Sequence, residues 1–154
     1  MRTAAAIDAG IPLIVLAEDD PDDRLLIGEA FAETGSTVEL LMLPDGEALI
    51  ECLRGGGAHA ARLSGRCAAL VICDINMPRR NGLEAIRALR EAGDCVGVPM
   101  VTLTSSRRDE ERERAAQAGA DAHYVKPSSF DELVEVARRM LEAHVFVRGR
   151  MRDA

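Results

Sequence analysis

The sequence predicts an α/β domain, a doubly wound parallel sheet of five strands with helices on both faces. Three observations predict it. Short aliphatic runs, apolar on both faces of a strand, recur at residues 13–17, 70–73 and 100–103, as is typical of strands that helices cover on either side. Stretches with helix-starting residues separate these runs, and strand and helix alternate along the chain. The crossovers between the parallel strands are then expected to be right-handed.

Two weaker strands and five helices complete the alternation. Residues 37–42 and 122–125 predict the additional strands. The helices are predicted at about 20–33 (Asp20 before Pro21), 45–54 (Asp45), 81–93 (Asn81 with Glu84), 106–119 (Ser106 with Asp109) and 129–144 (Ser129 with Glu132). Each opening pattern supplies an N-cap, and Gly93 and Gly119 suit helix ends.

The last two helices differ in what they can bury. The final helix repeats apolar residues at helical spacing and predicts a core-facing stripe of Phe130, Leu133, Val134, Ala137, Met140, Leu141 and His144. Residues 107–118 of the fourth helix contain no apolar side chain larger than alanine, so we expect this helix to pack weakly and to move easily. The glycine-rich segment 55–66 is predicted to be an exposed loop.

Composition indicates one domain with an aliphatic core. The chain has 154 residues, with one Tyr, three Phe and no Trp, and its net charge is −7. This charge disfavours nonspecific binding to nucleic acid or to an anionic membrane. The sequence shows no signal peptide and no stretch long enough to span a membrane, and its four cysteines lack disulfide or zinc-site spacing. We therefore expect a cytoplasmic protein.

Polar side chains follow the predicted strands at their carboxyl ends. Glu18 and Asp19 come after the first strand, and Asp74 closes the third. Thr104 ends the fourth strand and Lys126 follows the fifth. Because ligands of open α/β sheets bind outside the carboxyl ends of the strands, we expect these side chains to converge in one pocket.

Such a pocket suits phosphoryl chemistry. Three converging carboxylates repel one another and need a counter-ion, and hard oxygen ligands favour Mg²⁺. Thr104 and Lys126 can then bind a phosphoryl group that Asp74 accepts as a nucleophile. Each residue alone also fits a simpler role as a helix cap, turn residue or strand end. The joint pattern at the ends of four strands favours the phosphoryl site.

The sequence resembles the receiver domain of bacterial response regulators over about residues 11–144. The segments that carry the resemblance are IVLAEDDPDDRLL, LVICDINMPRRNGLEAI, VPMVTLTSS and AGADAHYVKPSSFDEL. The family implies a flavodoxin-like (βα)5 sheet with strand order 2-1-3-4-5. We expect residues 1–10 and 145–154 to be tails and no output domain to be present.

The resemblance also implies roles for individual residues. Asp74 is the expected phosphoacceptor. The implied Mg²⁺ ligands are Glu18, Asp19, Asp74 and the backbone carbonyl of Asn76, and the implied phosphoryl-binding residues are Thr104 and Lys126. In the family this lysine usually precedes a cis proline, here Pro127.

One position departs from the family pattern. Three residues before the lysine the family often has Tyr or Phe, whose ring moves inward on activation, but this chain has His123. His123 is either a switch residue or an ordinary surface residue of the last strand. Tyr124 is expected on the opposite face of that strand.

The family implies protein partners. A sensor histidine kinase or a phosphotransfer protein would supply the phosphoryl group, and a downstream protein would recognise the phosphorylated state. The EDDPDD run, the glycine-rich insert and the expected lack of an output domain resemble the small regulators paired with phytochrome-type kinases. Those regulators act as single domains and often as homodimers.

Two other functions fit parts of the pattern. A phosphatase with an aspartate nucleophile commonly has a second acid two residues later, whereas this chain has Asn76. We therefore expect slow self-phosphorylation and self-dephosphorylation and no turnover of external substrates. A pseudo-receiver would bind proteins without accepting phosphate, but the presence of the full acid pair, Asp74, Thr104 and Lys126 disfavours it.

Overall fold

A five-stranded parallel sheet forms the centre of the protein. The computed structural model describes residues 10–57, 63, 67–77, 79–93 and 97–147. The strands are β1 (Leu13–Ala17), β2 (Glu39–Leu43), β3 (Leu70–Cys73), β4 (Met100–Thr104) and β5 (Ala122–Val125). Their order in the sheet is β2-β1-β3-β4-β5. The predicted α/β class and strand order are confirmed.

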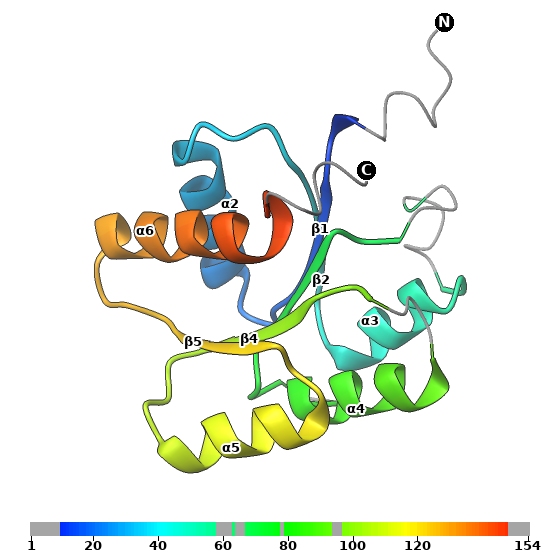
Figure 1. Ribbon diagram of the computed structural model, residues 1–154. Coiled ribbons are helices and arrows are strands. Elements are labelled where there is room, and N and C mark those ends of the chain that lie inside the picture. The colour runs from blue at the N-terminus through cyan, green and yellow to red at the C-terminus, as the bar shows by residue number, and fades with distance from the viewer. Residues whose placement is uncertain (1–9, 58–62, 64–66, 78, 94–96, 148–154) are drawn as a thin grey trace, which may run out of the picture.

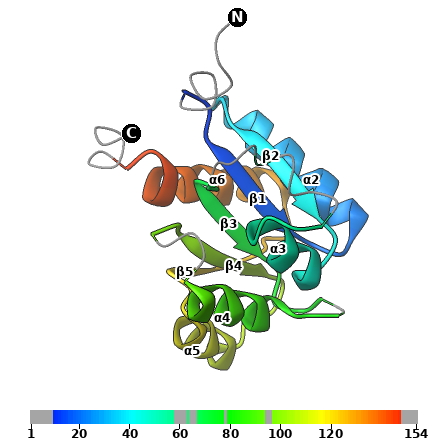
Figure 2. The same cartoon turned by 90° about the vertical axis from the view of Figure 1, so that its right-hand side faces the viewer.

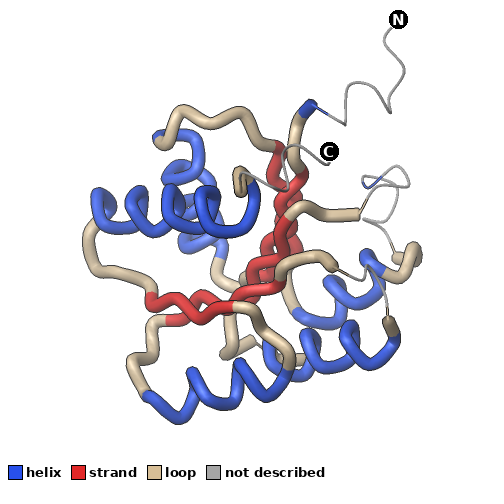
Figure 3. The backbone as a smooth tube through the Cα atoms, viewed as in Figure 1, coloured by secondary structure: helices blue, strands red, loops and turns tan. Residues whose placement is uncertain are grey.

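Helices cover both faces of this sheet. On one face lie α2 (Pro21–Glu33) and α6 (Phe130–Met140), and on the other lie α3 (Gly46–Leu53), α4 (Gly82–Ala92) and α5 (Asp109–Ala118) (Figure 1). Figure 2 shows the strands between the two layers from a second side, and Figure 3 distinguishes the helices, in blue, from the strands, in red. A π-helical turn, Leu141–Val145, continues α6. Within the described residues, no helix is both long and apolar enough to cross a membrane.

The core consists of two aliphatic layers, one on each face of the sheet. Alternate strand residues enter the two layers because successive side chains of a strand point to opposite faces. Val15 and Val71 join the layer under α3 and α4. Ile14 and Ile72 join the layer under α2 and α6, where Phe31 is a large buried aromatic residue. Three of the five strands, β1, β3 and β4, are buried along their whole length, as their unbroken apolar runs predicted.

Most predicted helix starts are confirmed by cap hydrogen bonds. The Asp20 side chain accepts the N–H of Asp22 at 2.8 Å, and Pro21 is the first residue of α2. Asn81 and Glu84 form the predicted reciprocal capping box. These local bonds hold the helix starts, and α2 and α4 both begin next to the ends of strands that carry acidic residues.

Two predicted boundaries are wrong. The second strand runs from Glu39 to Leu43 because pairing with β1 sets its register from Leu13–Glu39 to Ala17–Leu43. Helix α5 begins at Asp109, later than the predicted start at Ser106. The Ser106 hydroxyl instead accepts the N–H of Arg108 at 3.4 Å within the loop, and no side chain caps α5.

Three further predictions need correction. Phe130 is 37% exposed, because it lies in the first turn of α6, where fewer neighbours cover a side chain. In the glycine-rich segment, Leu63 is buried in the core, while residues 58–62 and 64–66 lie outside the described part. The expected cis bond before Pro127 is wrong. The described peptide bonds are all trans, which is the form X–Pro bonds intrinsically favour.

Candidate functional site

The pairing of the strands brings the predicted acidic residues together. Ala17 pairs with Cys73, so Glu18 and Asp74 leave adjacent strands at the same level. The Asp74 N–H donates to the Ala17 carbonyl at 3.0 Å, which continues the ladder to the site itself. On the other side, the Lys126 N–H donates to the Thr104 carbonyl at 2.7 Å. The four predicted strand ends therefore form one site.

The Lys126 ammonium lies at the centre of this site. Its Nζ is 2.7 Å from Glu18 Oε1, 2.8 Å from Asp23 Oδ2 and 3.3 Å from Asp74 Oδ2. The side chains of Glu18 and Asp74 are only 1% and 10% exposed, whereas that of Asp23 is 36% exposed. Glu18 and Asp23 lie more than a hundred positions from Lys126 in the sequence, and Asp74 lies 52 positions from it.

The acidic residues are arranged in a way that suits a divalent cation. One carboxylate oxygen from each of Glu18, Asp19 and Asp74 lies within 4.8 Å of the others. Asp19 is exposed, so the cluster opens toward solvent. Because the single ammonium of Lys126 leaves this group of carboxylates with excess negative charge, a hard cation fits the donor set. The Asn76 N–H donates to Asp74 Oδ1 at 3.2 Å, which holds this asparagine next to the cluster.

Burial changes the acid–base properties of the cluster. It raises the pKa of Glu18 to about 7, although the hydrogen bond from Lys126 acts in the opposite direction. Burial alone would lower the pKa of Lys126, but its hydrogen bonds with Asp23 and Glu18 outweigh this effect and hold that pKa above its ordinary value. Burial also raises the pKa of the Cys73 thiol to about 12, so Cys73 is an inert core residue.

Thr104 lies at the edge of the same site. It is fully buried at the end of β4, and its Oγ1 accepts the N–H of Ser106 at 3.4 Å. The hydroxyl therefore stands where the loop to α5 begins, and any movement of the hydroxyl would alter the start of that loop.

His123 occupies a more specific environment than an ordinary surface position. It is partly buried, and its Nδ1 lies 2.5 Å from Oγ1 of Thr102, its partner residue on β4. Burial lowers the pKa of His123, and Arg112 adds to this effect while Glu111 opposes it. Tyr124 points to the opposite face, as predicted, and its hydroxyl lies 2.9 Å from His144 Nε2.

Glycine is required directly behind Asp74. Gly82, the first residue of α4, donates its N–H to the Ile75 carbonyl at 3.1 Å. A Cβ atom at position 82 would collide with the carbonyl oxygen of Asp74. The backbone at Asp74 thus packs directly against the start of α4.

The sequence interpretation missed Asp23 as a residue of the site. The pattern of Asp20 before Pro21 predicts a helix cap, which is right, but it does not predict that Asp23 contacts Lys126. A signal was present in the spacing. Asp23 is in the first turn of a helix whose N-terminus lies beside the acid pair, so its side chain could be expected near the pocket.

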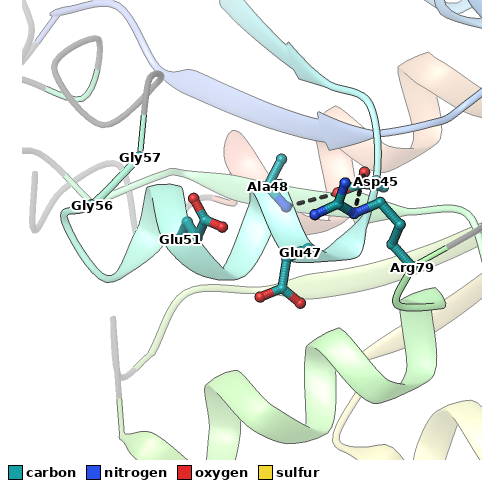
Figure 4. Close-up of a pocket in the computed structure, with 7 residues that line it drawn as sticks. All are labelled: Asp45, Glu47, Ala48, Glu51, Gly56, Gly57 and Arg79. Carbon is teal, nitrogen blue, oxygen red and sulfur yellow. Dashed lines mark hydrogen bonds and ion pairs between the residues drawn. The ribbon is translucent and has the colours of Figure 1, made fainter.

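A second hollow lies along α3 and contains none of the predicted site residues. It is lined by Asp45, Glu47, Ala48, Glu51, Gly56, Gly57 and Arg79. In Figure 4 the Arg79 side chain extends toward Asp45, and its Nε is 3.7 Å from Asp45 Oδ2. Asp45 is occupied as the cap of α3, accepting the Ala48 N–H at 2.8 Å. This hollow is therefore explained by helix capping and an exposed ion pair.

Comparison with known proteins agrees with this geometry. A family model described as the response regulator receiver domain matches residues 14–138. The probable methanogenesis regulatory protein FilR2 of Methanothrix harundinacea is 29% identical over 133 residues, which cover 84% of this chain and 81% of FilR2. The chain spans only about half the length of other curated relatives, which are transcriptional and response regulators.

Solved structures give the same result. The response regulator RPA3017, described in red light signalling of R. palustris, has a TM-score of 0.78 and 29% identity, covering 85% of this chain and 92% of that one. The bacteriophytochrome response regulator AtBRR has a TM-score of 0.70 and 29% identity, covering 84% and 91%. With its family match, strand order and converging acidic site, the chain belongs to the response regulator receiver domains of two-component systems.

Proposed function

We propose that this receiver domain accepts a phosphoryl group on Asp74 and signals as a single domain through contacts with other proteins. The observation that carries the proposal is the shared position of Lys126, whose ammonium contacts both Asp74 and Glu18. Asp74 is buried yet adjoins the exposed Asp19, so an incoming group could reach its carboxylate from the solvent side of the cluster.

The metal in this proposal is Mg²⁺, held by Glu18, Asp19, Asp74 and the carbonyl of Asn76. A bound Mg²⁺ would neutralise part of the negative charge on a phosphoryl group as it is transferred. Oxygen-only ligands with one exposed member favour a cation that keeps several waters, which is the usual behaviour of Mg²⁺.

The transfer itself is a substitution at phosphorus. A carboxylate oxygen of Asp74 forms the new P–O bond, and the P–N bond of a donor phosphohistidine breaks, with its electron pair leaving on the imidazole, which takes a proton from solvent. Lys126 is placed to bind one oxygen of the transferred group. The Thr104 hydroxyl would donate a hydrogen bond to another oxygen of this group, and its movement would pull the loop that leads to α5 toward the site.

The proposed partners are proteins. The donor is a sensor histidine kinase or a phosphotransfer protein, and the likeness to RPA3017 and AtBRR supports a phytochrome-type kinase. A downstream protein, or a second copy of the chain in a homodimer, would recognise the surface altered by phosphorylation. His123 is proposed as a switch residue in this response, because its bond to Thr102 joins β5 to β4 two residues before Thr104.

Asn76 supports a signalling role over a phosphatase. An amide at this position cannot protonate a leaving group, so self-dephosphorylation of Asp74 is expected to be slow. Phosphate esters offered as substrates would then show no turnover, whereas a phosphatase would hydrolyse them repeatedly.

Labelling with a small phosphodonor tests the proposal. Wild-type protein is incubated with radiolabelled acetyl phosphate and Mg²⁺, beside the variant Asp74→Asn and the matched control Asp45→Asn. Asparagine caps helices as well as aspartate, so the control should keep its fold and label normally. Asp74→Asn should take no label, and a chelator should abolish labelling of the wild type. Labelling of Asp74→Asn at the wild-type level would refute the assignment.

A further inference from the structure

Asp23 makes an ion pair that helix capping does not explain. Its Oδ2 lies 2.8 Å from Lys126 Nζ, closer than the 3.3 Å that separates Asp74 Oδ2 from the same atom. Asp23 belongs to the first turn of α2, whereas Lys126 follows β5 at the other end of the domain sequence. The pair therefore joins α2 to the segment after β5 across the site.

The number of N–H donors on the Lys126 ammonium explains how the pair with Asp23 can affect Asp74. A lysine Nζ carries three N–H groups, and here three carboxylates surround it. Glu18 and Asp23 accept at the shorter distances, and Asp74 at the longest. If a phosphoryl group forms on Asp74, one of its oxygens can take the third N–H while the other two bonds stay in place. Two short bonds therefore aim the third donor at the reacting position.

The first turn of α2 is itself anchored to the site. The Asp20 side chain caps this turn through the N–H of Asp22, and Arg24 Nη1 donates to the Glu18 carbonyl oxygen at 2.6 Å. These bonds fix the helix start relative to the end of β1. Asp23, between Asp22 and Arg24, is thus held by the backbone in a position from which its carboxylate reaches Lys126.

We propose that Asp23 is a positioning residue for phosphorylation, which holds the Lys126 ammonium so that its third N–H faces the oxygens of the phosphoryl group. This inference rests on the proposed function, because it assumes that Asp74 is the acceptor. Asp23 acts through Lys126 and has no contact with the transferred group in this scheme. Without it, the lysine keeps one short tether, to Glu18, and its ammonium can rotate away from the acceptor.

Two measurements on three variants test the proposal. The first is the initial rate of labelling by acetyl phosphate with Mg²⁺. The second is the ¹H–¹⁵N NMR signal of the Lys126 ammonium, whose protons exchange slowly with water only while they are held in hydrogen bonds. The variants are Asp23→Ala, Asp23→Asn and Asp22→Ala. Asp22→Ala is the matched control, because it also removes an exposed acid from the first turn of α2, without an ion pair to Lys126 among the described residues.

In Asp23→Ala we expect the labelling rate to fall roughly fivefold, the size of a partly exposed charge-assisted hydrogen bond, and the ammonium signal to be lost by fast exchange. Asp23→Asn retains an acceptor oxygen and should recover part of both readouts. Asp22→Ala should match the wild type in both. Equal rates and an unchanged ammonium signal in Asp23→Ala and Asp22→Ala would overturn the proposal.

The two proposals fail in different ways. If the wild type takes no label at all, the phosphoacceptor assignment fails, and the positioning role falls with it even where the ammonium signal depends on Asp23. If the wild type is labelled and Asp23→Ala is labelled equally fast, only the role of Asp23 is overturned.

Discussion

Helices α5 and α6 flank the same edge strand, β5, but they are attached to the domain by different means. Helix α6 buries Val134, Ala137 and Met140 and begins with a Ser129 cap that accepts the Glu132 N–H at 3.1 Å. Helix α5 buries only two alanines and one carboxylic acid, Glu111, and has no side-chain cap. One helix is held by apolar packing, and the other has little to hold it.

This difference indicates that α5 is the helix that can move at the smaller cost in free energy. A fully buried large aliphatic side chain contributes about 1.5–3 kcal/mol, and alanine contributes much less. The Oε1 atom of Glu111 is buried without a hydrogen-bond partner among the described residues, which lowers the stability of α5 further. Because α5 follows the loop that starts at Thr104, the weakly held helix is the one that a change at Thr104 would reach first.

The largest expected effect concerns α6. Met140→Ala should lower the free energy of unfolding by about 2–5 kcal/mol, because Met140 is 1% exposed and its removal leaves a cavity. Ala115→Gly in α5 should cost only about 1 kcal/mol, mainly through helix propensity. Urea denaturation of both variants measures the contrast. Equal losses would show that the two helices are held equally.

Replacing the buried acid of α5 should strengthen its attachment. Glu111→Met removes a buried carboxylate oxygen that lacks a hydrogen-bond partner among the described residues, and keeps a similar volume, so we expect a gain in stability of about 1–2 kcal/mol. Glu113→Met on the exposed side of the same helix is the control and should change stability by less than about 0.5 kcal/mol. A loss of stability in Glu111→Met would mean that the carboxylate stabilises α5, which would contradict the conclusion that Glu111 weakens the attachment of this helix.

Substitutions at the N-cap positions of α6 and α5 test the same difference between the helices, with smaller expected effects on stability. Ser129→Ala should cost about 1 kcal/mol, since it leaves the Glu132 N–H without its acceptor. Arg108→Asp should stabilise α5 by about 0.5–1 kcal/mol, because Arg108 already has the extended backbone of an N-cap but makes no cap bond. Thermal unfolding of the two variants measures the change in melting temperature. A shift of the same sign in both variants would contradict the conclusion that, of these two helices, only α6 has a side-chain cap.

The smallest effect is the pH dependence at His123, which lies under α5. Its pKa is lowered by burial and by Arg112, so the folded protein favours the neutral ring. Its contribution to stability is then fully present above the unfolded pKa of about 6.5 and is lost as the pH falls below that value. The difference in unfolding free energy between wild type and His123→Gln should be flat above about pH 6.5 and decline below it. A difference that grows toward acid would give the opposite sign.

Most features that depend on residues close together in the sequence were predicted correctly, whereas some features that depend on strand pairing were not. The bounds of β1 and β3 were correct because runs apolar on both faces end where polar residues begin, and the bounds of β5 were correct although its run includes His123 and Tyr124. The bounds of β2 were not, since its register is set by hydrogen bonds to β1 that only the folded sheet reveals. The caps at Asp20 and Asn81 were correct because capping involves residues within one turn.

The site followed from the same logic. Glu18, Asp74, Thr104 and Lys126 could be placed together because parallel strands end at one edge of the sheet. The spacing places Asp23 in the first turn after the acid pair and so near the pocket, but its contact with Lys126 also depends on the angle at which α2 leaves β1. The partner of His123 was equally hidden, since Thr102 becomes its neighbour only through the pairing of β4 with β5.

The close packing of Gly82 against the Asp74 carbonyl bears on how such a domain can be re-engineered. A designer who wishes to redirect the domain to a new target could graft α4 and α5 from a relative onto this sheet. The graft would have to keep glycine at its first helical position, since any side chain there would collide with the carbonyl oxygen of Asp74. The outer surface of the graft is free to vary, but its first residue is not.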